Sequence, residues 1–313
     1  MNIKNKLKKS KIIMISYDYF RNIDMKLLTS ISPVYASKYI YKKKFKKILD
    51  LQNPSTFNEK LMWLKLYWEN SLKSICADKY AVREYIKKMG EENCLNELYS
   101  VYNYVEDIEW DKLPNEFVLK VTNTCGANII CNDKSKLNEK ETLDKLTRWM
   151  KDKFYFRFAE IHYKDIKPTI ICEKYLKPEK GLVPIDYKVY CFNGEPKVMM
   201  LCTGRGSGNL KYHFCDLEGN ILPFDDTAKL SIKNGINKIE LPHTVAEMYR
   251  ISSVLSKNIP FVRIDFYDHD GKVVFGEMTF TPCACLDNSI SEEGEHIMGD
   301  WIKLPKNIKI MNK

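Results

Sequence analysis

Two apolar stretches that flank a turn near the C-terminus constrain this chain more than any other feature. The segment "RIDFYDHDGKVVFGEMTFTP" begins at Arg263 and ends at Pro282, and Asp-His-Asp-Gly separates its two arms. Strand-forming arms around such a turn predict a half-buried β-hairpin. Asp265 lies on the first arm and Glu277 on the second. A three-residue loop would place the two acids directly opposite each other, and a two-residue turn would offset them by one position.

Two carboxylates that face each other across a strand pair repel each other. A magnesium ion removes this repulsion, because it prefers hard oxygen ligands. The pair therefore predicts a magnesium site, and removing one acid should maintain or raise stability without metal. In the alternative interpretation, both acids face solvent or pair with Lys or Arg. Arg263, on the same strand face as Asp265, is either such a partner or a clamp on an anionic substrate.

Composition indicates a globular protein with reduced thiols. The chain has 313 residues, 44% of them hydrophobic, which is enough for about two domains. Its ten cysteines have no disulfide spacing, and Cys283-Ala-Cys285 lacks the second pair that a zinc site needs. The apolar run Ile12–Ser16 is too short for a signal peptide, and no run approaches the ~20 apolar residues of a membrane-spanning helix. We therefore expect a cytoplasmic protein.

The positive charge is concentrated at the N-terminus. Residues 1–50 hold 13 Lys and Arg against 3 Asp and Glu, a net charge of +10, whereas the whole chain has +9. One interpretation is a solvated, partly helical segment. The other is attraction to an anionic membrane face, with Ile12, Ile13, Tyr17 and Phe20 as shallow anchors. Nucleic acid is a weaker candidate, because the rest of the chain is not basic.

Helix and strand patterns alternate along the remaining sequence. Thr56 and Glu59 have the spacing of a capping box, and Asp78 precedes a helix that ends near Gly90. Further helices are expected at 134–154 and 244–259. Strands are expected at 116–122, 127–133, Thr169–Tyr175, Tyr187–Phe192, Pro196–Cys202 and Lys211–Cys215. Many of the strands are joined by hairpin turns, which favours an α+β fold with mostly antiparallel sheets.

Two further segments have a composition that suits a nucleotide. In "FVLKVTNTCGANII", Lys120 lies on a strand and a small-residue loop with Gly126 follows. Such a loop lets backbone amides approach a phosphate, although an ordinary hairpin has the same pattern. In "IICEKYL", an acid and a lysine end an apolar strand. This segment is either a sheet edge or a hinge whose backbone pairs with a purine.

The order of these motifs resembles that of ATP-grasp enzymes, which include D-alanine–D-alanine ligases and protein-modifying glutamate ligases. More closely, the chain is similar to the TupA-like ATP-grasp family of bacterial polysaccharide and teichuronopeptide loci. Five segments carry this resemblance, which covers roughly residues 50–303: "STFNEKLMWLKLY", "DKYAVREYI", "KLPNEFVLKVTNTCG", "DYKVYCFNGEPK" and "PFVRIDFYDHDGKVVFGEMTF".

The resemblance implies an ATP-grasp fold, in which two α+β subdomains clasp ATP. A short, helical, basic N-terminal region at 1–77 would precede the core at 78–303, and 304–313 would be a tail. Within the core, the first subdomain would cover about 110–176 and the second 177–303, with the metal-binding hairpin in the second. The α/β domain that usually precedes this core would be absent or shrunken, so the acceptor site cannot be located.

The resemblance also implies which residues bind the nucleotide. Lys79 and Lys120 match the two lysines that contact the phosphates. Glu173 and the backbone of the three residues that follow match the adenine hinge. The complete set of nucleotide-binding residues would be Lys79, Lys120, Glu173, Lys174, Tyr175, Leu176, Asp186 and Lys188.

Metal-binding and catalytic roles follow from the same resemblance. Asp265 and Glu277 would hold Mg²⁺ that bridges the ATP phosphates, and Thr279 occupies the place of a frequent Asn ligand. Arg263 would steady the transferred phosphoryl group or the acyl-phosphate oxygens, and Lys120, also catalytic, would contact the phosphates. Arg205 would meet the acid substrate.

The implied reaction joins a carboxylate to an amine at the expense of ATP, with ADP as a product. In polysaccharide pathways the acid would be a uronic acid or an amino acid, and the amine an amino acid or an amino sugar. These substrates could be lipid-linked or polysaccharide-bound, at the inner membrane face. Two alternatives stay open: a polysaccharide glycosyltransferase that uses Asp268-His269-Asp270, and a non-catalytic protein that keeps the fold without ATP.

Overall fold

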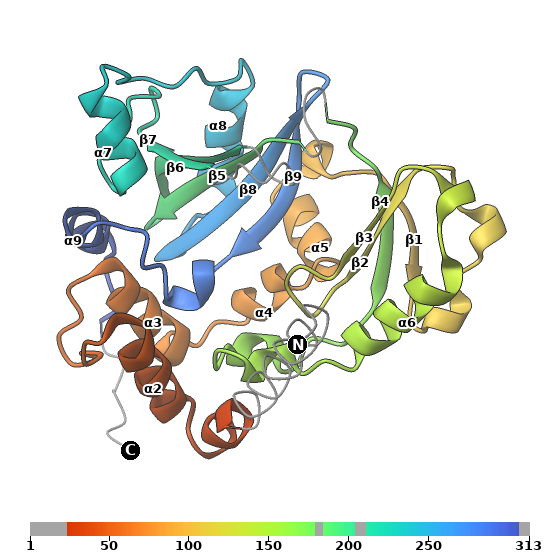
Figure 1. The fold of residues 1–313 in the computed structure, drawn as a ribbon, viewed down its shortest axis with the longest axis horizontal. Coiled ribbons are helices and arrows are strands. Elements are labelled where there is room, and N and C mark those ends of the chain that lie inside the picture. Colours follow the sequence, from red (N-terminus) through yellow and green to blue (C-terminus); the bar gives the residue numbers. More distant parts are fainter. Residues whose placement is uncertain (1–23, 179–183, 204–210, 307–313) are drawn as a thin grey trace, which may run out of the picture.

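The computed structural model describes residues 24–178, 184–203 and 211–306 of the chain, and these form an α+β fold with two antiparallel sheets (Figure 1). In the first sheet the strand order is β1-β4-β2-β3, and in the second it is β7-β6-β5-β8-β9. The strands of the first sheet are β1 (Leu98–Tyr102), β2 (Phe117–Val121), β3 (Asn128–Cys131) and β4 (Ile170–Lys174). Those of the second are β5 (Asp186–Phe192), β6 (Glu195–Thr203), β7 (Lys211–Cys215), β8 (Phe261–His269) and β9 (Lys272–Thr279).

Helices enclose the two sheets. Figure 1 shows α6 against the first sheet and α7 and α8 beside the second, with α4 and α5 between the sheets. The helices are α2 (Pro33–Phe45), α3 (Phe57–Tyr67), α4 (Leu72–Ala77), α5 (Ala81–Lys88), α6 (Glu139–Met150), α7 (Asp226–Lys233), α8 (Val245–Leu255) and α9 (Glu292–Trp301). Residues 24–31 are also helical. The predicted strands and helices are confirmed, with ends that differ by a few residues.

Local sequence explains where several helices begin. At α3, the Thr56 hydroxyl accepts a hydrogen bond from the Glu59 amide, and the Glu59 carboxylate accepts one from the Thr56 amide. The predicted capping box is therefore confirmed. Before α5, the Asp78 carboxylate accepts hydrogen bonds from the backbone amides of Tyr80 and Ala81, so it satisfies donors that the helix leaves free.

The hairpin of β8 and β9 has a two-residue turn, yet its acids lie directly opposite each other. Asp270 and Gly271 form the turn with φ of 52° and 71°, as a type I′ turn requires. A β-bulge at Gly276 then restores the register, so that Asp265 faces Glu277. A Cβ at Gly276 would lie 3.0 Å from the carbonyl oxygen of Asp265, and only glycine avoids this close contact.

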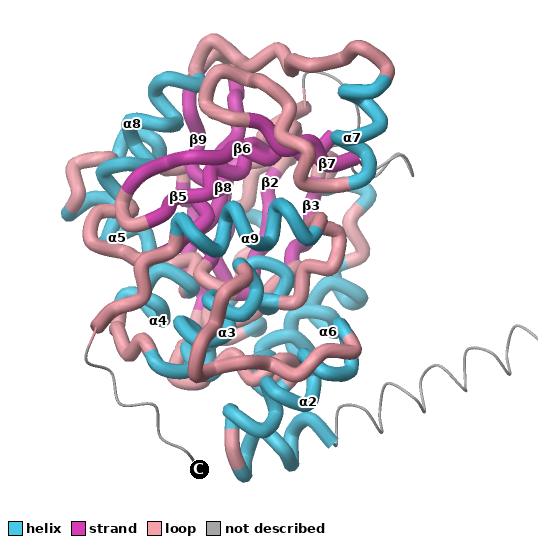
Figure 2. The backbone as a smooth tube through the Cα atoms, turned by 90° about the vertical axis from the view of Figure 1, so that its left-hand side faces the viewer, coloured by secondary structure: helices cyan, strands magenta, loops and turns pink. Residues whose placement is uncertain are grey.

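Each sheet has its own hydrophobic core, and the N-terminal helices belong to the core of the second sheet. The smaller core lies between the first sheet and α6. The larger joins the second sheet to α2, α3, α8 and α9. Phe57 on α3 is 1% exposed, and its ring centroid lies 5.2 Å from that of Phe261 on β8. Figure 2 shows α2 and α3 below the second sheet, with α9 against α3. The helices before residue 78 therefore share a core with the second sheet, and the division at residue 77 stays a prediction.

The chain makes an unusual turn after β9. Cys283, Ala284 and Cys285 all have positive φ, between 49° and 62°. Non-glycine residues rarely adopt this left-handed conformation, which costs roughly 1–2 kcal/mol per residue. Thr281, just before the turn, donates a hydrogen bond of 2.6 Å to the buried Glu160 carboxylate. This bond helps to hold the strained segment in place.

Candidate active site

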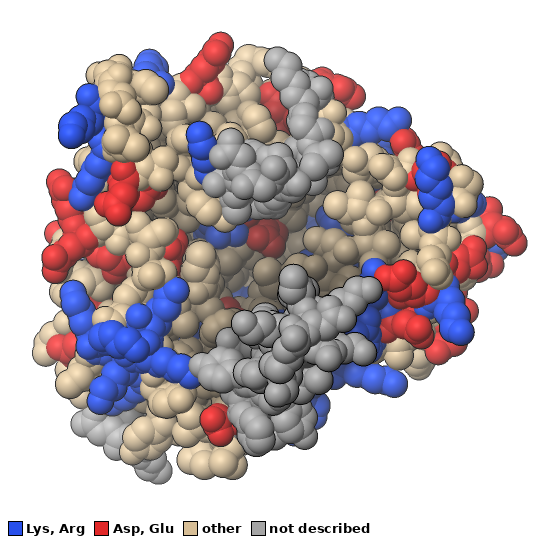
Figure 3. Space-filling view, in the orientation of Figure 1, with Lys and Arg blue, Asp and Glu red and all other residues tan. Residues whose placement is uncertain are grey.

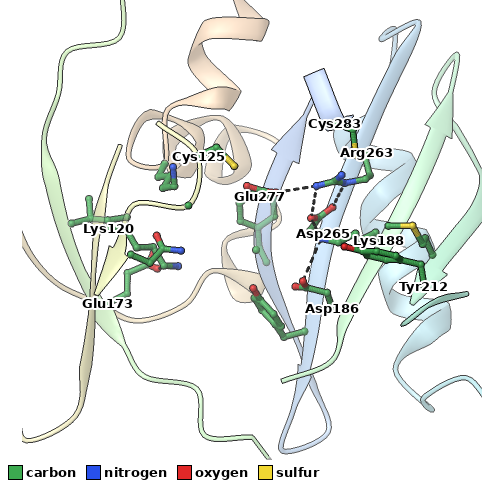
Figure 4. Close-up of a pocket in the computed structure, with 18 of the residues that line it drawn as sticks. Lys120, Cys125, Glu173, Asp186, Lys188, Tyr212, Arg263, Asp265, Glu277 and Cys283 are labelled. Carbon is green, nitrogen blue, oxygen red and sulfur yellow. Dashed lines mark hydrogen bonds and ion pairs between the residues drawn. The ribbon is translucent and has the colours of Figure 1, made fainter. Parts of the chain in front are cut away.

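A pocket of about 400 Å³ opens between the two sheets (Figure 4). Its walls come from the start of α5, from β2 and β4 of the first sheet, and from β5, β8 and β9 of the second. The structure brings together most of the predicted site residues here, although they are widely separated in sequence. Those that line the pocket are Lys79, Lys120, Glu173, Asp186, Lys188, Arg263, Asp265 and Glu277.

On the first sheet, a carboxylate is held between two cations. Lys120 on β2 and Glu173 on the neighbouring strand β4 point to the same face, and their Nζ and Oε2 atoms are 2.6 Å apart. The other oxygen, Oε1, lies 3.0 Å from Nη1 of Arg83. The Glu173 side chain is only 8% exposed, whereas that of Lys120 is 24% exposed toward the pocket. Lys120 thus has room to contact a ligand while it stays paired.

Lys79 reaches the same space from the segment before α5. Its ammonium donates a hydrogen bond to the backbone carbonyl of Thr124, in the small-residue loop between β2 and β3. Burial lowers the pKa of Lys79, although the nearby Glu277 carboxylate opposes this effect. An anionic ligand beside Lys79 would favour its charged form.

On the second sheet, Asp265 is the centre of a buried ion network. Nε and Nη2 of Arg263 lie 2.7 Å and 2.8 Å from its two oxygens, and Lys188 on β5 also binds it. Burial alone would raise the pKa of Asp265, but the Arg263 guanidinium and the Lys188 ammonium bring it below its ordinary value. Lys188 also lies 3.4 Å from an Asp186 oxygen. Asp265 is therefore ionised and tightly held.

Glu277 is the accessible member of the opposed pair. Its side chain is 43% exposed, and its Oε1 atom accepts a hydrogen bond of 3.0 Å from Arg263. Arg263 also donates to the hydroxyl of Thr279, at 3.3 Å. The sequence left two interpretations of Asp265 and Glu277, a magnesium site or pairing with Arg and Lys. The contacts in this structure are those of the second interpretation. On this geometry we expect removal of Asp265 to lower stability, contrary to the expectation from the sequence, since the carboxylate neutralises two buried cations.

The two acids differ in how well they fit Mg²⁺. Within the described ranges, no group of three or more His, Cys, Asp or Glu could hold a metal. Magnesium needs only one or two carboxylates when waters and substrate phosphates complete its shell. Glu277 fits this role because it faces the pocket. Asp265 fits only by exchanging a contact with Arg263 or Lys188 for one with the metal.

Other predicted residues lie beside the pocket or outside the described residues. Thr279, Lys174, Tyr175 and Leu176 are not among the described lining residues. The Lys174 amide donates to the carbonyl of Glu97, and its carbonyl accepts from Asn96. At Lys174, the first residue of the predicted hinge, both backbone groups thus already make hydrogen bonds within the protein. Arg205 lies outside the described residues.

Several lining residues were not expected from the sequence. Arg83 follows Lys79 by four positions near the start of α5, and this helical spacing could have identified it. The strained turn contributes Cys283, and the segment after it contributes Asp287 and Ser289. Their approach depends on the left-handed turn, which the sequence "PCACLDNS" does not indicate.

The acids of the glycosyltransferase alternative lie elsewhere. Asp268 and Asp270 are at the distal end of the β8–β9 hairpin, and neither is among the described lining residues. Asp268 accepts a hydrogen bond of 2.9 Å from Thr244, and the Asp270 side chain is 82% exposed.

Comparison with known protein families identifies one family whose model matches this chain. The model of the TupA-like ATP-grasp family matches residues 59–303. No curated protein matches the chain. Solved structures with some similarity include D-alanine–D-alanine ligase from Bacillus anthracis in complex with ATP. It has 16% identity over 73% of this chain and 65% of its own, with a TM-score of 0.45.

A second similar structure is D-alanine–D-alanine ligase from Helicobacter pylori, with 15% identity and a TM-score of 0.40, over 74% of this chain and 60% of its own. This chain therefore spans slightly less than two thirds of either of these two structures.

Proposed function

Because the chain belongs to the TupA-like ATP-grasp family, we propose that it is an ATP-dependent carboxylate–amine ligase. Family membership by itself indicates ATP binding and the fold of ATP-dependent ligases. The observation that carries the finer proposal is the pocket, which is lined by the cations Lys79, Lys120, Lys188 and Arg263 and by the accessible Glu277. Phosphoryl transfer needs this arrangement, since its catalysis rests on positioning and on stabilising charge.

The proposed reaction has two steps. First, a carboxylate oxygen of the acid substrate attacks the γ-phosphorus of ATP, the bond to the bridging oxygen breaks, and ADP leaves. Second, the amine nitrogen attacks the carbonyl carbon of the acyl phosphate. Phosphate then leaves with the electron pair of the C–O bond, the nitrogen loses a proton, and an amide is formed.

The residues have distinct tasks in this proposal. Lys79 and Lys120 bind the phosphates, and Arg263 steadies the transferred phosphoryl group. Magnesium, when bound at Glu277 and Asp265 with Thr279 nearby, neutralises phosphate charge. Nucleoside contacts come from Glu173, Lys174, Tyr175, Leu176, Asp186 and Lys188, and Arg205 meets the acid substrate.

The proposed biological setting is capsular or cell-surface polysaccharide biosynthesis. The acid is a uronic acid or an amino acid, and the amine is an amino acid or an amino sugar, carried on a lipid or a polysaccharide. The protein acts in the cytoplasm, at the inner membrane face. Asp287 and Ser289 lie in the same pocket and are candidates for contact with the amine.

Two measurements test the proposal. Isothermal titration with ATP should show binding that requires magnesium. In the presence of candidate acids, ATP and magnesium, hydroxylamine should trap the acyl phosphate as a hydroxamate, with one ADP released for each. Glu277→Gln should abolish this turnover. The control Asp270→Asn changes an exposed acid at the turn of the same hairpin and should have no effect, because Asn tolerates the positive φ there.

The other possible outcomes identify the alternatives. ATP binding without ADP release for any acid would favour a non-catalytic protein. Absence of ATP binding, together with hydrolysis of a nucleotide sugar, would favour a glycosyltransferase. Either result would overturn the ligase proposal.

A further inference from the structure

The surface of the N-terminal helices combines exposed apolar side chains with lysines. We call it the α2 surface, and its apolar members are exposed to between 43% and 80%. Thirteen large hydrophobic side chains are exposed in the described part of the chain, and five of these lie between residues 27 and 48. The α2 surface consists of Leu27, Ile31, Tyr35, Tyr39 and Ile48 with Lys38, Lys42, Lys43, Lys44, Lys46 and Lys47.

These apolar side chains are not needed for the core, because α2 already has a core-facing side. Ala36 and Ile40 are 0% and 8% exposed and belong to the larger core. Tyr35 and Tyr39, four positions apart on the same helix, are 56% and 43% exposed. A helix that is apolar on two sides needs a second environment for its outer side.

The charge of this region is strongly positive. Residues 24–50 contain seven lysines and two aspartates. Lys43 lies 5.7 Å above the ring of Tyr39, and Lys47 lies 3.7 Å from Glu292 in an exposed pair that contributes little. Figure 3 shows the lysines gathered over α2, on the face that also carries the hollow between the two sheets.

We propose that the α2 surface binds anionic lipid headgroups. This proposal rests in part on the proposed function and specifies how the protein would be held at the membrane. Lysines can keep their ammonium groups among the headgroups while their alkyl chains cover apolar surface. Ile31 and Ile48, at 69% and 80% exposure, suit shallow insertion and serve no purpose on a soluble polyanion. None of the helices in the described ranges is long and apolar enough to cross a membrane.

This arrangement would place the substrate within reach of the pocket. The basic side chains and the hollow lie on one face in Figure 3, so a carrier embedded in the same leaflet could present its head group to the site. The surface differs from the expected anchors Ile12, Ile13, Tyr17 and Phe20, which lie outside the described residues.

Vesicle sedimentation of the full-length protein tests the proposal. The protein should sediment with vesicles of phosphatidylcholine and phosphatidylglycerol, and much less with phosphatidylcholine alone or at high salt. The variant K42Q/K43Q/K44Q/K46Q should bind anionic vesicles on the order of 100-fold more weakly, because each basic residue near the membrane strengthens binding. The control K140Q/K151Q/K153Q/K164Q removes the same charge from exposed lysines outside the α2 surface and should bind nearly as well as wild type.

A second pair of variants separates lipid from other polyanions. I31S/I48S should weaken vesicle binding and leave binding to heparin unchanged, whereas L230S/I236S, exposed elsewhere, should change neither. Equal loss in the two lysine variants, or unchanged vesicle binding in I31S/I48S, would overturn the proposal. Magnesium-dependent ATP titration of each variant should match wild type. ATP binding that fails in wild type would count against the proposed function, separately from the vesicle result.

Discussion

The two sheets hold charge at the pocket in opposite ways. The first sheet buries a carboxylate, Glu173, and leaves Lys120 partly exposed. The second buries two cations around Asp265 and leaves the carboxylate of Glu277 accessible. One wall thus offers a cation and the other an anion. Under the proposed function, this division suits a magnesium–nucleotide complex, whose phosphates need cations and whose metal needs an oxygen ligand.

Lys79 and Lys188, which lie on opposite sides of the pocket, differ in the direction in which their pKa is shifted. Burial lowers the pKa of Lys79, which lies on the side of the first sheet. Burial would also lower the pKa of Lys188, but the Asp265 carboxylate raises it above its ordinary value. The Asp265 carboxylate therefore keeps Lys188 in its charged form, whereas no carboxylate fully offsets the burial of Lys79.

The substitution with the largest expected effect on stability is at Asp265, on the second sheet. Asp265→Asn should lower the free energy of unfolding by about 3–5 kcal/mol, because it leaves Arg263 and Lys188 buried without a shared counter-ion. Glu277→Gln should change it by at most about 1 kcal/mol, since that side chain is 43% exposed. Denaturant titration followed by circular dichroism would measure both. If the two variants were equally stable, Asp265 would not contribute more to stability than the accessible Glu277, and the contrast between the two acids would be wrong.

Lys120→Ala should weaken ATP binding by about 10- to 150-fold, because a charge-assisted contact contributes ~1.5–3 kcal/mol. Isothermal titration in the presence of magnesium would show the change. Lys112→Ala serves as the control, since its side chain is 74% exposed and lies outside the pocket. A dissociation constant that is unchanged in Lys120→Ala would move the phosphates away from the first sheet.

Glu173→Gln should destabilise the protein by about 1–3 kcal/mol, because Arg83 and Lys120 lose their common partner. The effect should be smaller than that of Asp265→Asn, since water reaches Lys120. Glu97→Gln is a suitable control: its side chain is 61% exposed and lies 3.8 Å from Lys174. Thermal unfolding would rank the three variants, and a loss in Glu173→Gln larger than in Asp265→Asn would reverse the proposed order.

The smallest effect concerns pH. Lys79 loses its proton at a lower pH than an ordinary lysine, so ATP affinity should fall, roughly tenfold or less, as the pH rises through its depressed pKa. Stability should move the other way. The unfolded chain holds this proton more tightly than the folded one, so the Lys79 contribution to stability increases over the same interval. Calorimetry across the alkaline range should show both trends in the difference between wild type and Lys79→Met, since the other titrating groups are common to the two proteins.

Local sequence determined much of the fold and part of the pocket. Thr56 and Glu59 specified the start of α3, and the apolar arms around Asp270-Gly271 specified the hairpin. These features depend on hydrogen bonds and periodicities that span a few residues, so they can be predicted from the sequence. That Asp265 and Glu277 lie close together could be expected for the same reason, but their exact register could not.

Only the tertiary structure decided how the charges are paired. The bulge at Gly276 sets the register of Asp265 and Glu277, and Arg83 reaches Glu173 across 90 positions of the chain. Pairs of this kind depend on strand order, packing and the desolvation of whole groups, none of which has a local pattern in the sequence. The left-handed turn at Cys283 contains no glycine, so the local sequence does not predict it. Contacts with the surrounding structure hold these residues in a conformation that they do not prefer.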